Sequence, residues 1–183
     1  MKTDLSTYNN SWYQPGGKVK RLLWYYISWL CFEGGWNISS TLKVFLLKCF
    51  GAQIGRGVVI KPKVTIKYPW RLIIKDHCWI GESVWIDNLD MVTIESHVCI
   101  SQGALLLCGN HNYKSPSFDL MVAPIYLKEG SWVGAKASVA PGVTLQSHAV
   151  LTMGSVATSN LDAYGIYSGN PAIKVKTRTI NKP

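Results

Sequence analysis

The chain has 183 residues, a length that fits one compact domain with some appendage. Because 48% of the residues are hydrophobic and only 16% are charged, the composition excludes an intrinsically disordered protein. The net charge of +9 indicates an anionic partner: phosphate groups, a nucleic acid or a membrane surface. The basic residues form no long run and accompany no nucleic-acid-binding motif, so we expect no nucleic-acid partner.

The cysteines are odd in number and match no paired metal-ligand pattern: Cys31, Cys49, Cys78, Cys99 and Cys108. We interpret them as reduced structural thiols. Such thiols are typical of a cytoplasmic protein, and we expect that location.

Residues 1–51 differ from the rest of the chain and are predicted to form a helical cap. The apolar stretch from Leu22 to Phe32 is too short to span a bilayer, which takes about 20 residues. A second helix is predicted to begin near Ser39 or Ser40 and to end at Gly51. The helices can cover the open end of a repeat structure, or contact the inner face of a membrane peripherally, and the two roles are compatible.

A six-residue repeat runs through residues 52–162. Its large positions are aliphatic except the last: Ile54, Ile60, Ile66, Ile74, Ile80, Ile86, Ile94, Ile100, Leu106, Leu127, Val133, Val139, Leu145, Leu151 and Ala157. Four residues after most of them stands a smaller side chain: Val58, Val64, Cys78, Val84, Val98, Ala104, Ser131, Ala137, Val143, Ala149 and Ser155. A period of six fits neither an α-helix nor a simple alternating strand, so it predicts stacked structural repeats.

We interpret the repeat as a parallel β-helix, which makes the chain mainly β. Each coil has three short strands, and each strand points one bulky and one small residue into a narrow triangular interior. The first three coils start at residues 54, 74 and 94, a step of twenty, whereas the step from 127 to 145 is eighteen. The longer coils therefore carry two extra residues at a corner. Each coil buries its interior only against its neighbours.

The repeat stops at an insertion over residues 107–124. Loops that project from a repeat commonly carry function. His111 lies near its start, and an imidazole can take a proton from a hydroxyl group that attacks a thioester. A lone loop histidine can equally be solvated and without a role. Cys108 could act as a nucleophile, but direct transfer needs only a base, and we expect no covalent intermediate.

Three further histidines, His77, His97 and His148, each follow a coil-starting aliphatic residue by three positions. They should therefore share one corner, with His77 and His97 stacked. Stacked imidazoles could bind zinc, as in γ-class carbonic anhydrases. Gly130 interrupts the column, however, and we expect structural turn residues and no metal.

The chain resembles the left-handed β-helix O-acetyltransferases, and most closely the colanic acid biosynthesis acetyltransferase family. The segments that carry this resemblance span nearly the whole chain: Asp4-Leu5-Ser6, Phe50-Gly51-Ala52-Gln53-Ile54-Gly55, Tyr68-Pro69-Trp70, Gly109-Asn110-His111, Ala123-Pro124-Ile125, Ala140-Pro141-Gly142-Val143-Thr144 and Tyr167-Ser168-Gly169-Asn170-Pro171-Ala172. The resemblance implies a left-handed coil, with N-terminal α-helices and an inserted active-site loop. It also implies a homotrimer with each active site between neighbouring subunits.

By this resemblance, His111 is the general base. The residues implied to contact the acceptor, a sugar or glycan, are Asp87, Asn88, Asn110 and Asp119. The donor would be acetyl-CoA, held by Trp132, Gly134, Ala135, Lys136, Met153, Thr158, Lys174 and Arg178. Residues 163–183 would form a C-terminal tail that contributes to this donor site. Relatives often have Thr-Lys-Asp where this chain has Thr158-Ser159-Asn160, which shifts the phosphate contact towards Lys174 and Arg178.

Together these features predict an acetyl-CoA-dependent O-acetyltransferase that modifies a sugar hydroxyl, in exopolysaccharide or other surface-glycan biosynthesis. Three alternatives remain: a xenobiotic (antibiotic) acetyltransferase, a zinc protein like γ-class carbonic anhydrase, and a non-catalytic trimeric scaffold.

Overall fold

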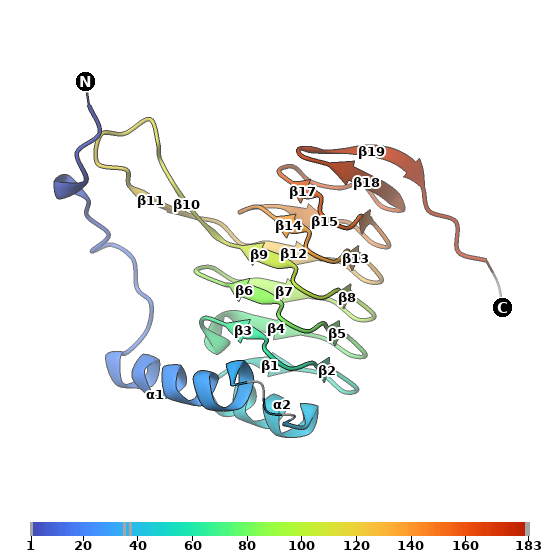
Figure 1. Cartoon of the computed structure of the whole chain (residues 1–183), viewed down its shortest axis with the longest axis horizontal. Coiled ribbons are helices and arrows are strands. Elements are labelled where there is room, and N and C mark those ends of the chain that lie inside the picture. The colour runs from blue at the N-terminus through green and yellow to red at the C-terminus, as the bar shows by residue number, and fades with distance from the viewer. Residues whose placement is uncertain (1, 35, 37, 182–183) are drawn as a thin grey trace.

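A computed structural model describes residues 2–34, 36 and 38–181 of the protein (Figure 1). Two N-terminal helices cover one end of a β-solenoid, and an antiparallel hairpin projects from its side. The helical elements of the described chain are η1 (Leu5–Thr7), α1 (Lys18–Ser28), the π-helical turn η2 (Trp29–Glu33), α2 (Ser40–Cys49) and η3 (Pro69–Arg71).

Helix α2 begins and ends where the sequence predicts. The Ser39 hydroxyl accepts a hydrogen bond from the Leu42 backbone N–H at 3.3 Å, a side-chain N-cap. Gly51 follows the helix with a φ of +98°, a conformation that favours glycine. None of the described helices is long and apolar enough to cross a lipid bilayer.

Three sheets, parallel except for the last strand of sheet B, form the sides of the solenoid. Sheet A contains β1 (Gln53–Ile54), β4 (Leu72–Ile74), β7 (Val92–Ile94), β12 (Ile125–Leu127) and β15 (Thr144–Leu145). Sheet B contains β2 (Val59–Ile60), β5 (Trp79–Ile80), β8 (Cys99–Ile100), β13 (Trp132–Val133), β16 (Val150–Leu151), β18 (Gly165–Gly169) and β19 (Ala172–Thr177). Sheet C contains β3 (Thr65–Ile66), β6 (Trp85–Asp87), β9 (Leu105–Leu107), β14 (Ser138–Val139) and β17 (Val156–Ala157).

The interior is built as the six-residue repeat predicts. In sheet A, for example, Ile54 pairs with Ile74 and Ile74 with Ile94, so equivalent aliphatic residues stack from coil to coil. Every bulky and small repeat position named above is at most 7% exposed. These stacked layers form one continuous hydrophobic core, and the predicted β-helix is confirmed.

The corner between sheets A and B, corner AB, carries the three histidines as turn residues. His77, His97 and His148 have φ values of +57°, +61° and +61°. The rings of His77 and His97 stack with their centroids 5.5 Å apart, as predicted. Gly130 sits directly against the His148 ring, where a Cβ atom would collide with the imidazole. The glycine in this column thus accommodates the histidine of the next coil.

The corner between sheets C and A, corner CA, holds the extra residues of the long coils. From Ile66 to Ile74 the chain takes eight steps instead of six and forms η3 on the way. In the third coil the same corner gives rise to the hairpin of β10 (Gly109–His111) and β11 (Leu120–Val122). Corner CA is therefore where the regular solenoid is repeatedly extended.

The C-terminal segment continues the solenoid beyond Ala157, where the predicted repeat ends. Leu161 forms a parallel bridge with Leu145, and β18 adds a strand to sheet B next to β16. Strand β19 then folds back antiparallel to β18. This final hairpin covers the edge that a bare last coil would leave unpaired.

Candidate functional site

The hairpin fixes the orientation of the His111 side chain. His111 is the last residue of β10, and its Nδ1 atom lies 2.8 Å from the Phe118 carbonyl oxygen. Because a carbonyl oxygen only accepts hydrogen bonds, Nδ1 must carry the proton of the neutral imidazole. The lone pair is then on Nε2. The arrangement presents Nε2 as a proton acceptor.

Two aromatic rings hold the imidazole in place. The Phe118 ring stacks on it with centroids 4.6 Å apart and planes 9° from parallel. Tyr8, from the N-terminal segment, contributes a tilted ring at 5.8 Å. That segment also donates a backbone hydrogen bond from Asp4 to the Pro116 carbonyl at 2.8 Å. Neither Tyr8 nor Phe118 was predicted from the sequence, because both contacts depend on the path of non-repeating segments.

Asp119 organises the hairpin tip and makes no hydrogen bond to the imidazole. Its carboxylate accepts hydrogen bonds from the Ser117 hydroxyl at 2.7 Å and the Ser115 hydroxyl at 2.9 Å. These bonds, that of Ser117 first, hold the pKa of the carboxyl below its ordinary value of 3.8. The preceding residue, Phe118, has a φ of +54°, which is costly for a non-glycine residue. Asp119 thus stabilises the turn that presents Phe118 to His111.

Cys108 lies in the core at the base of the hairpin. It is fully buried, and burial raises the pKa of its thiol to about 12. At neutral pH the sulfur is therefore protonated and is a poor nucleophile.

Asn110 precedes His111 and remains exposed. Its side-chain Oδ1 accepts a hydrogen bond from the His111 backbone N–H at 2.8 Å, and its amide nitrogen is not part of that bond. Asn110 is therefore beside the proposed base and open to solvent.

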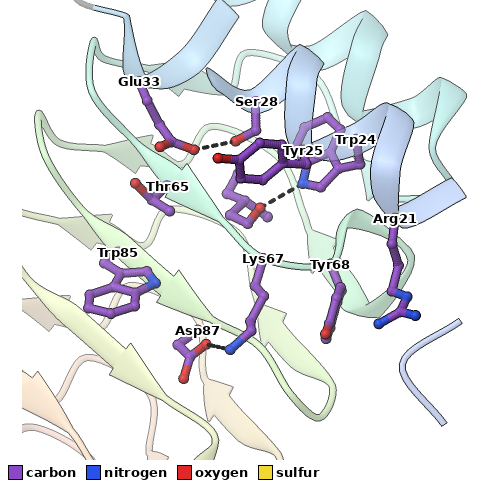
Figure 2. A pocket seen from close by; sticks show the side chains of 11 residues that line it. Arg21, Trp24, Tyr25, Ser28, Glu33, Thr65, Lys67, Tyr68, Trp85 and Asp87 are labelled. Atoms are coloured by element: carbon purple, nitrogen blue, oxygen red, sulfur yellow. Dashed lines mark hydrogen bonds and ion pairs between the residues drawn. The ribbon is translucent and has the colours of Figure 1, made fainter. Parts of the chain in front are cut away.

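A groove of about 390 Å³ lies between helix α1 and sheet C (Figure 2). Its lining combines aromatic rings with charged and hydroxyl groups: Arg21, Trp24, Tyr25, Ser28, Glu33, Thr65, Ile66, Lys67, Tyr68, Trp85 and Asp87. Asp87 Oδ1 lies 2.8 Å from Lys67 Nζ, an ion pair whose angles fall short of a hydrogen bond. Asp87 is also paired in register with Leu107, two residues before the hairpin begins. It therefore connects the groove with the base of the hairpin.

Asn88 is placed differently from its neighbour Asp87. It is fully buried, and its Oδ1 accepts a hydrogen bond from the Tyr68 backbone N–H at 2.9 Å. Its amide nitrogen donates to the Tyr68 carbonyl at 2.6 Å and to the Arg71 carbonyl at 3.1 Å. Asn88 thus supports corner CA, and in this chain it presents no surface to an acceptor. Of the predicted pair Asp87 and Asn88, only Asp87 lines the groove.

Several predicted donor contacts gather at the corner between sheets B and C, corner BC. Gly134, Ala135 and Lys136 form this corner in one coil and Met153 in the next, joined by a hydrogen bond from the Gly154 N–H to the Ala135 carbonyl at 2.8 Å. Trp132 lies beside them on β13, 44% exposed, and its Nε1 donates to the Ser101 hydroxyl at 2.9 Å. Ser101 in turn lines a hollow of about 590 Å³ in the coils below.

The remaining predicted donor contacts lie elsewhere. Arg178 is at corner AB, where one guanidinium nitrogen donates to the Gly130 carbonyl at 2.9 Å and the His148 carbonyl at 3.2 Å. It therefore lies across sheet B from the residues at corner BC. Lys174 is on β19 and pairs with Asp162 at 3.6 Å, while Thr158 is exposed at corner CA. The structure does not bring these three residues to corner BC.

Within one chain, His111 and corner BC lie at opposite edges of sheet C. The hairpin leaves corner CA after β9, whereas Gly134 and Ala135 precede β14 at corner BC. The two groups of predicted site residues are therefore separated by the width of sheet C in the single chain. Among the described residues, no group of three or more His, Cys, Asp or Glu side chains could hold a metal ion.

Comparison with known proteins finds acetyltransferases, the class that the sequence predicts. The chain is 35% identical over 166 residues, 91% of each sequence, to the protein named "Putative colanic acid biosynthesis acetyltransferase WcaF" of Escherichia coli strain K12. A hexapeptide-repeat acetyltransferase of Vibrio cholerae in complex with acetyl-CoA superposes with a TM-score of 0.78 at 17% identity, over 87% of each chain. A galactoside acetyltransferase in complex with coenzyme A gives 0.75 at 21% identity, over 87% of this chain and 80% of that one. No protein-family model matches the chain.

The fold is thus the left-handed parallel β-helix of the hexapeptide-repeat acetyltransferases, as predicted. The protein is an acetyltransferase, which excludes the non-catalytic scaffold. At 35% identity over 91% of its length, it belongs to the family of the colanic acid biosynthesis acetyltransferases.

Proposed function

We propose that this protein transfers an acetyl group from acetyl-CoA to a hydroxyl group of a sugar, in the biosynthesis of an exopolysaccharide or another surface glycan. The observation that carries the proposal is the 2.8 Å contact between His111 Nδ1 and the Phe118 carbonyl, which leaves Nε2 free to accept a proton. The name of the WcaF relative supports the glycan pathway. The five free cysteines fit a cytoplasmic location.

The reaction follows from one base acting twice. His111 Nε2 takes the proton of the sugar hydroxyl while the oxygen attacks the thioester carbonyl carbon. When the tetrahedral intermediate collapses, the carbon–sulfur bond breaks and the imidazolium gives its proton to the departing thiolate. No charge remains on the enzyme at the end of the cycle, and no covalent enzyme intermediate is required.

The active site of this proposal lies between neighbouring chains of a homotrimer. Since His111 and the donor residues occupy opposite edges of sheet C, a ring of chains can place the hairpin of each chain against corner BC of the next. Three equivalent sites then form.

The donor would lie along corner BC. Trp132 offers an aromatic face beside the half-buried Ala135 and the exposed Met153, and Lys136 supplies a cation for the phosphates of the nucleotide. The acetyl-CoA and coenzyme A complexes of the two related folds support this choice of donor.

The acceptor would enter from the base of the hairpin, between Asn110 and Asp87. Aromatic rings such as Trp85, 49% exposed in the adjacent groove, stack well on the apolar faces of sugars. The charged pair of Lys67 and Asp87 can hydrogen-bond sugar hydroxyls. The groove could therefore hold further units of an extended glycan.

The test measures acetyl transfer from radiolabelled acetyl-CoA by the wild type and by His111→Ala. The candidate acceptors are a panel of mono- and oligosaccharides and, to test the xenobiotic alternative, chloramphenicol. His111→Ala should lower turnover by about two to four orders of magnitude, the usual contribution of a general base. Calorimetry should show unchanged acetyl-CoA binding. The matched control is His148→Asn, since His148 Nδ1 also faces a backbone carbonyl, that of Glu129 at 3.0 Å, but lies at corner AB.

Near-normal turnover in His111→Ala would refute the assignment of the base. Acetylation of chloramphenicol in preference to every sugar would move the protein to the xenobiotic class. The control His148→Asn should keep the turnover of the wild type. If its turnover fell as far as that of His111→Ala, the assay would be measuring loss of folded protein and not loss of the base.

A further inference from the structure

The outer surface of the N-terminal helices is apolar, and no other part of the described chain covers it. Helix α1 buries only the edge that carries Trp24 and Ser28. The rest of the helical cap exposes large hydrophobic side chains, all at least 44% exposed: Val19, Leu22, Leu23, Tyr26, Trp29, Leu30, Trp36, Leu42 and Phe45. We call this set the base surface. Apolar patches of this extent mark interaction sites.

The charges around the base surface indicate what covers it. Residues 18–49 contain five lysine or arginine residues, of which Lys43 is buried, and a single acid, Glu33, which accepts a hydrogen bond from the Ser28 hydroxyl at 2.7 Å. Lys18 and Lys48 are exposed on the same two helices, whereas Lys20 Nζ lies over the Trp70 ring, 4.7 Å from its centroid. Tryptophan and tyrosine among aliphatic residues, with lysines at the border, are typical of helices that lie in the interface of a bilayer.

We propose that the base surface docks onto an anionic lipid bilayer, with α1 and α2 lying in the plane of the interface. Hydrophobic burial of the base surface and attraction of its lysines to anionic headgroups would both contribute to binding.

The position of the base surface in the molecule is compatible with catalysis on a membrane. Figure 1 shows α1 and α2 at one end of the solenoid, whereas the hairpin leaves the third coil and the donor corner belongs to later coils. Docking through the helices would therefore leave both parts of the site uncovered. Lipid binding by the base surface does not depend on the acceptor or on acetyl transfer.

The experiment is co-sedimentation of the full-length protein with vesicles, either neutral phosphatidylcholine or with about a third of the lipid replaced by phosphatidylglycerol. The wild type should bind the anionic vesicles and bind the neutral ones more weakly. Leu23→Ser with Leu30→Ser should weaken binding by roughly tenfold or more. Lys18→Glu with Lys48→Glu should remove the preference for anionic lipid. The matched control is Ile173→Ser, which changes a hydrophobic residue on β19 that is 66% exposed.

Absence of wild-type binding to either vesicle would overturn the proposal. Light scattering without lipid supplies the second test. The leucine variant should keep the oligomeric state of the wild type, because its side chains face lipid and not another chain. A smaller oligomer in that variant would show that the base surface is a contact between copies, and would also overturn the proposal. A loss of binding in Ile173→Ser equal to that of the leucine variant would do the same.

Discussion

At the scale of single residues, the proposed site depends on the contact between the Phe118 carbonyl and the His111 imidazole. Phe118 contributes both its carbonyl oxygen, 2.8 Å from His111 Nδ1, and a ring that stacks on the imidazole at 4.6 Å. A φ of +54° allows the residue to do both. Such a conformation costs of the order of 1 kcal/mol, which the surrounding contacts must offset.

Phe118→Ala tests this positioning role. Loss of the stacked ring should let the imidazole rotate, so kcat should fall by about tenfold while KM for acetyl-CoA stays unchanged. Steady-state kinetics with the best acceptor from the saccharide panel measures both constants. The matched control is Tyr113→Ala, which removes a 75% exposed aromatic ring from the same hairpin. An unchanged kcat in Phe118→Ala would show that the ring does not position the base.

Cys108→Ala tests the absence of a covalent intermediate. The thiol is buried with a pKa raised to about 12, so it should not act as a nucleophile at neutral pH. We expect kcat within about threefold of the wild type and a free energy of unfolding lower by about 1 kcal/mol, from the lost packing. Kinetics and urea denaturation measure the two effects. A loss of kcat as large as in His111→Ala would contradict direct transfer.

Only some of these residues could be predicted from the sequence. His111 could be predicted because it lies at the start of an insertion that interrupts a strict repeat. Its partner Phe118 could not, because the contact depends on the course of a turn that follows no repeat. Asn88 and Arg178 were predicted to face ligands, but their hydrogen bonds to backbone groups of neighbouring coils were not readable from the sequence.

At the scale of the hairpin, the tip is stabilised by hydrogen bonds to a carboxylate. Ser115, Ser117 and Asp119 close the turn that presents Phe118. Because the pKa of Asp119 is lowered in the folded hairpin, its stabilising effect is present above the ordinary value of 3.8 and is lost as the pH falls through the lowered value. The tip should therefore be fully ordered at neutral pH.

Asp119→Asn should loosen the tip at neutral pH. The neutral amide makes weaker hydrogen bonds than the carboxylate, so backbone amides of residues 112–119 should lose hydrogen-exchange protection, corrected for intrinsic rates. The wild type should show the same loss only at pH values below 3.8. The control Asp162→Asn, at an exposed carboxylate of the C-terminal region, should leave these amides unchanged. Equal protection in Asp119→Asn and the wild type at neutral pH would contradict this role.

The elements themselves were predictable where the repeat is regular. Every strand from β1 to β9 and from β12 to β17 falls on a repeat position, because each needs one bulky residue for the interior. The final hairpin of β18 and β19 lies outside the repeat. Its one signal is the alternation of Ile173, Lys174, Val175 and Lys176, which is typical of a strand with one buried face, although all four residues are exposed in the structure.

At the scale of the whole molecule, sheet C separates the two halves of the proposed site. The proposed base lies at corner CA and the proposed donor residues at corner BC, so the proposal needs a neighbouring chain to bring them together. In the proposed function the assembly is therefore part of the catalytic mechanism. Under the proposed arrangement activity requires an oligomer, even though each solenoid has a continuous core of its own.

Mixed oligomers of two inactive variants test this arrangement most directly. Co-expressed His111→Ala chains lack the base, and Ala135→Trp chains have a blocked donor corner. Each variant alone should form trimers and show almost no transfer, and only Ala135→Trp should fail to bind acetyl-CoA. In random mixed trimers about a quarter of the sites would pair an intact hairpin with an intact corner, so the mixture should regain about a quarter of the wild-type rate per chain. If mixed trimers confirmed by native mass spectrometry stay inactive, the site does not lie between chains.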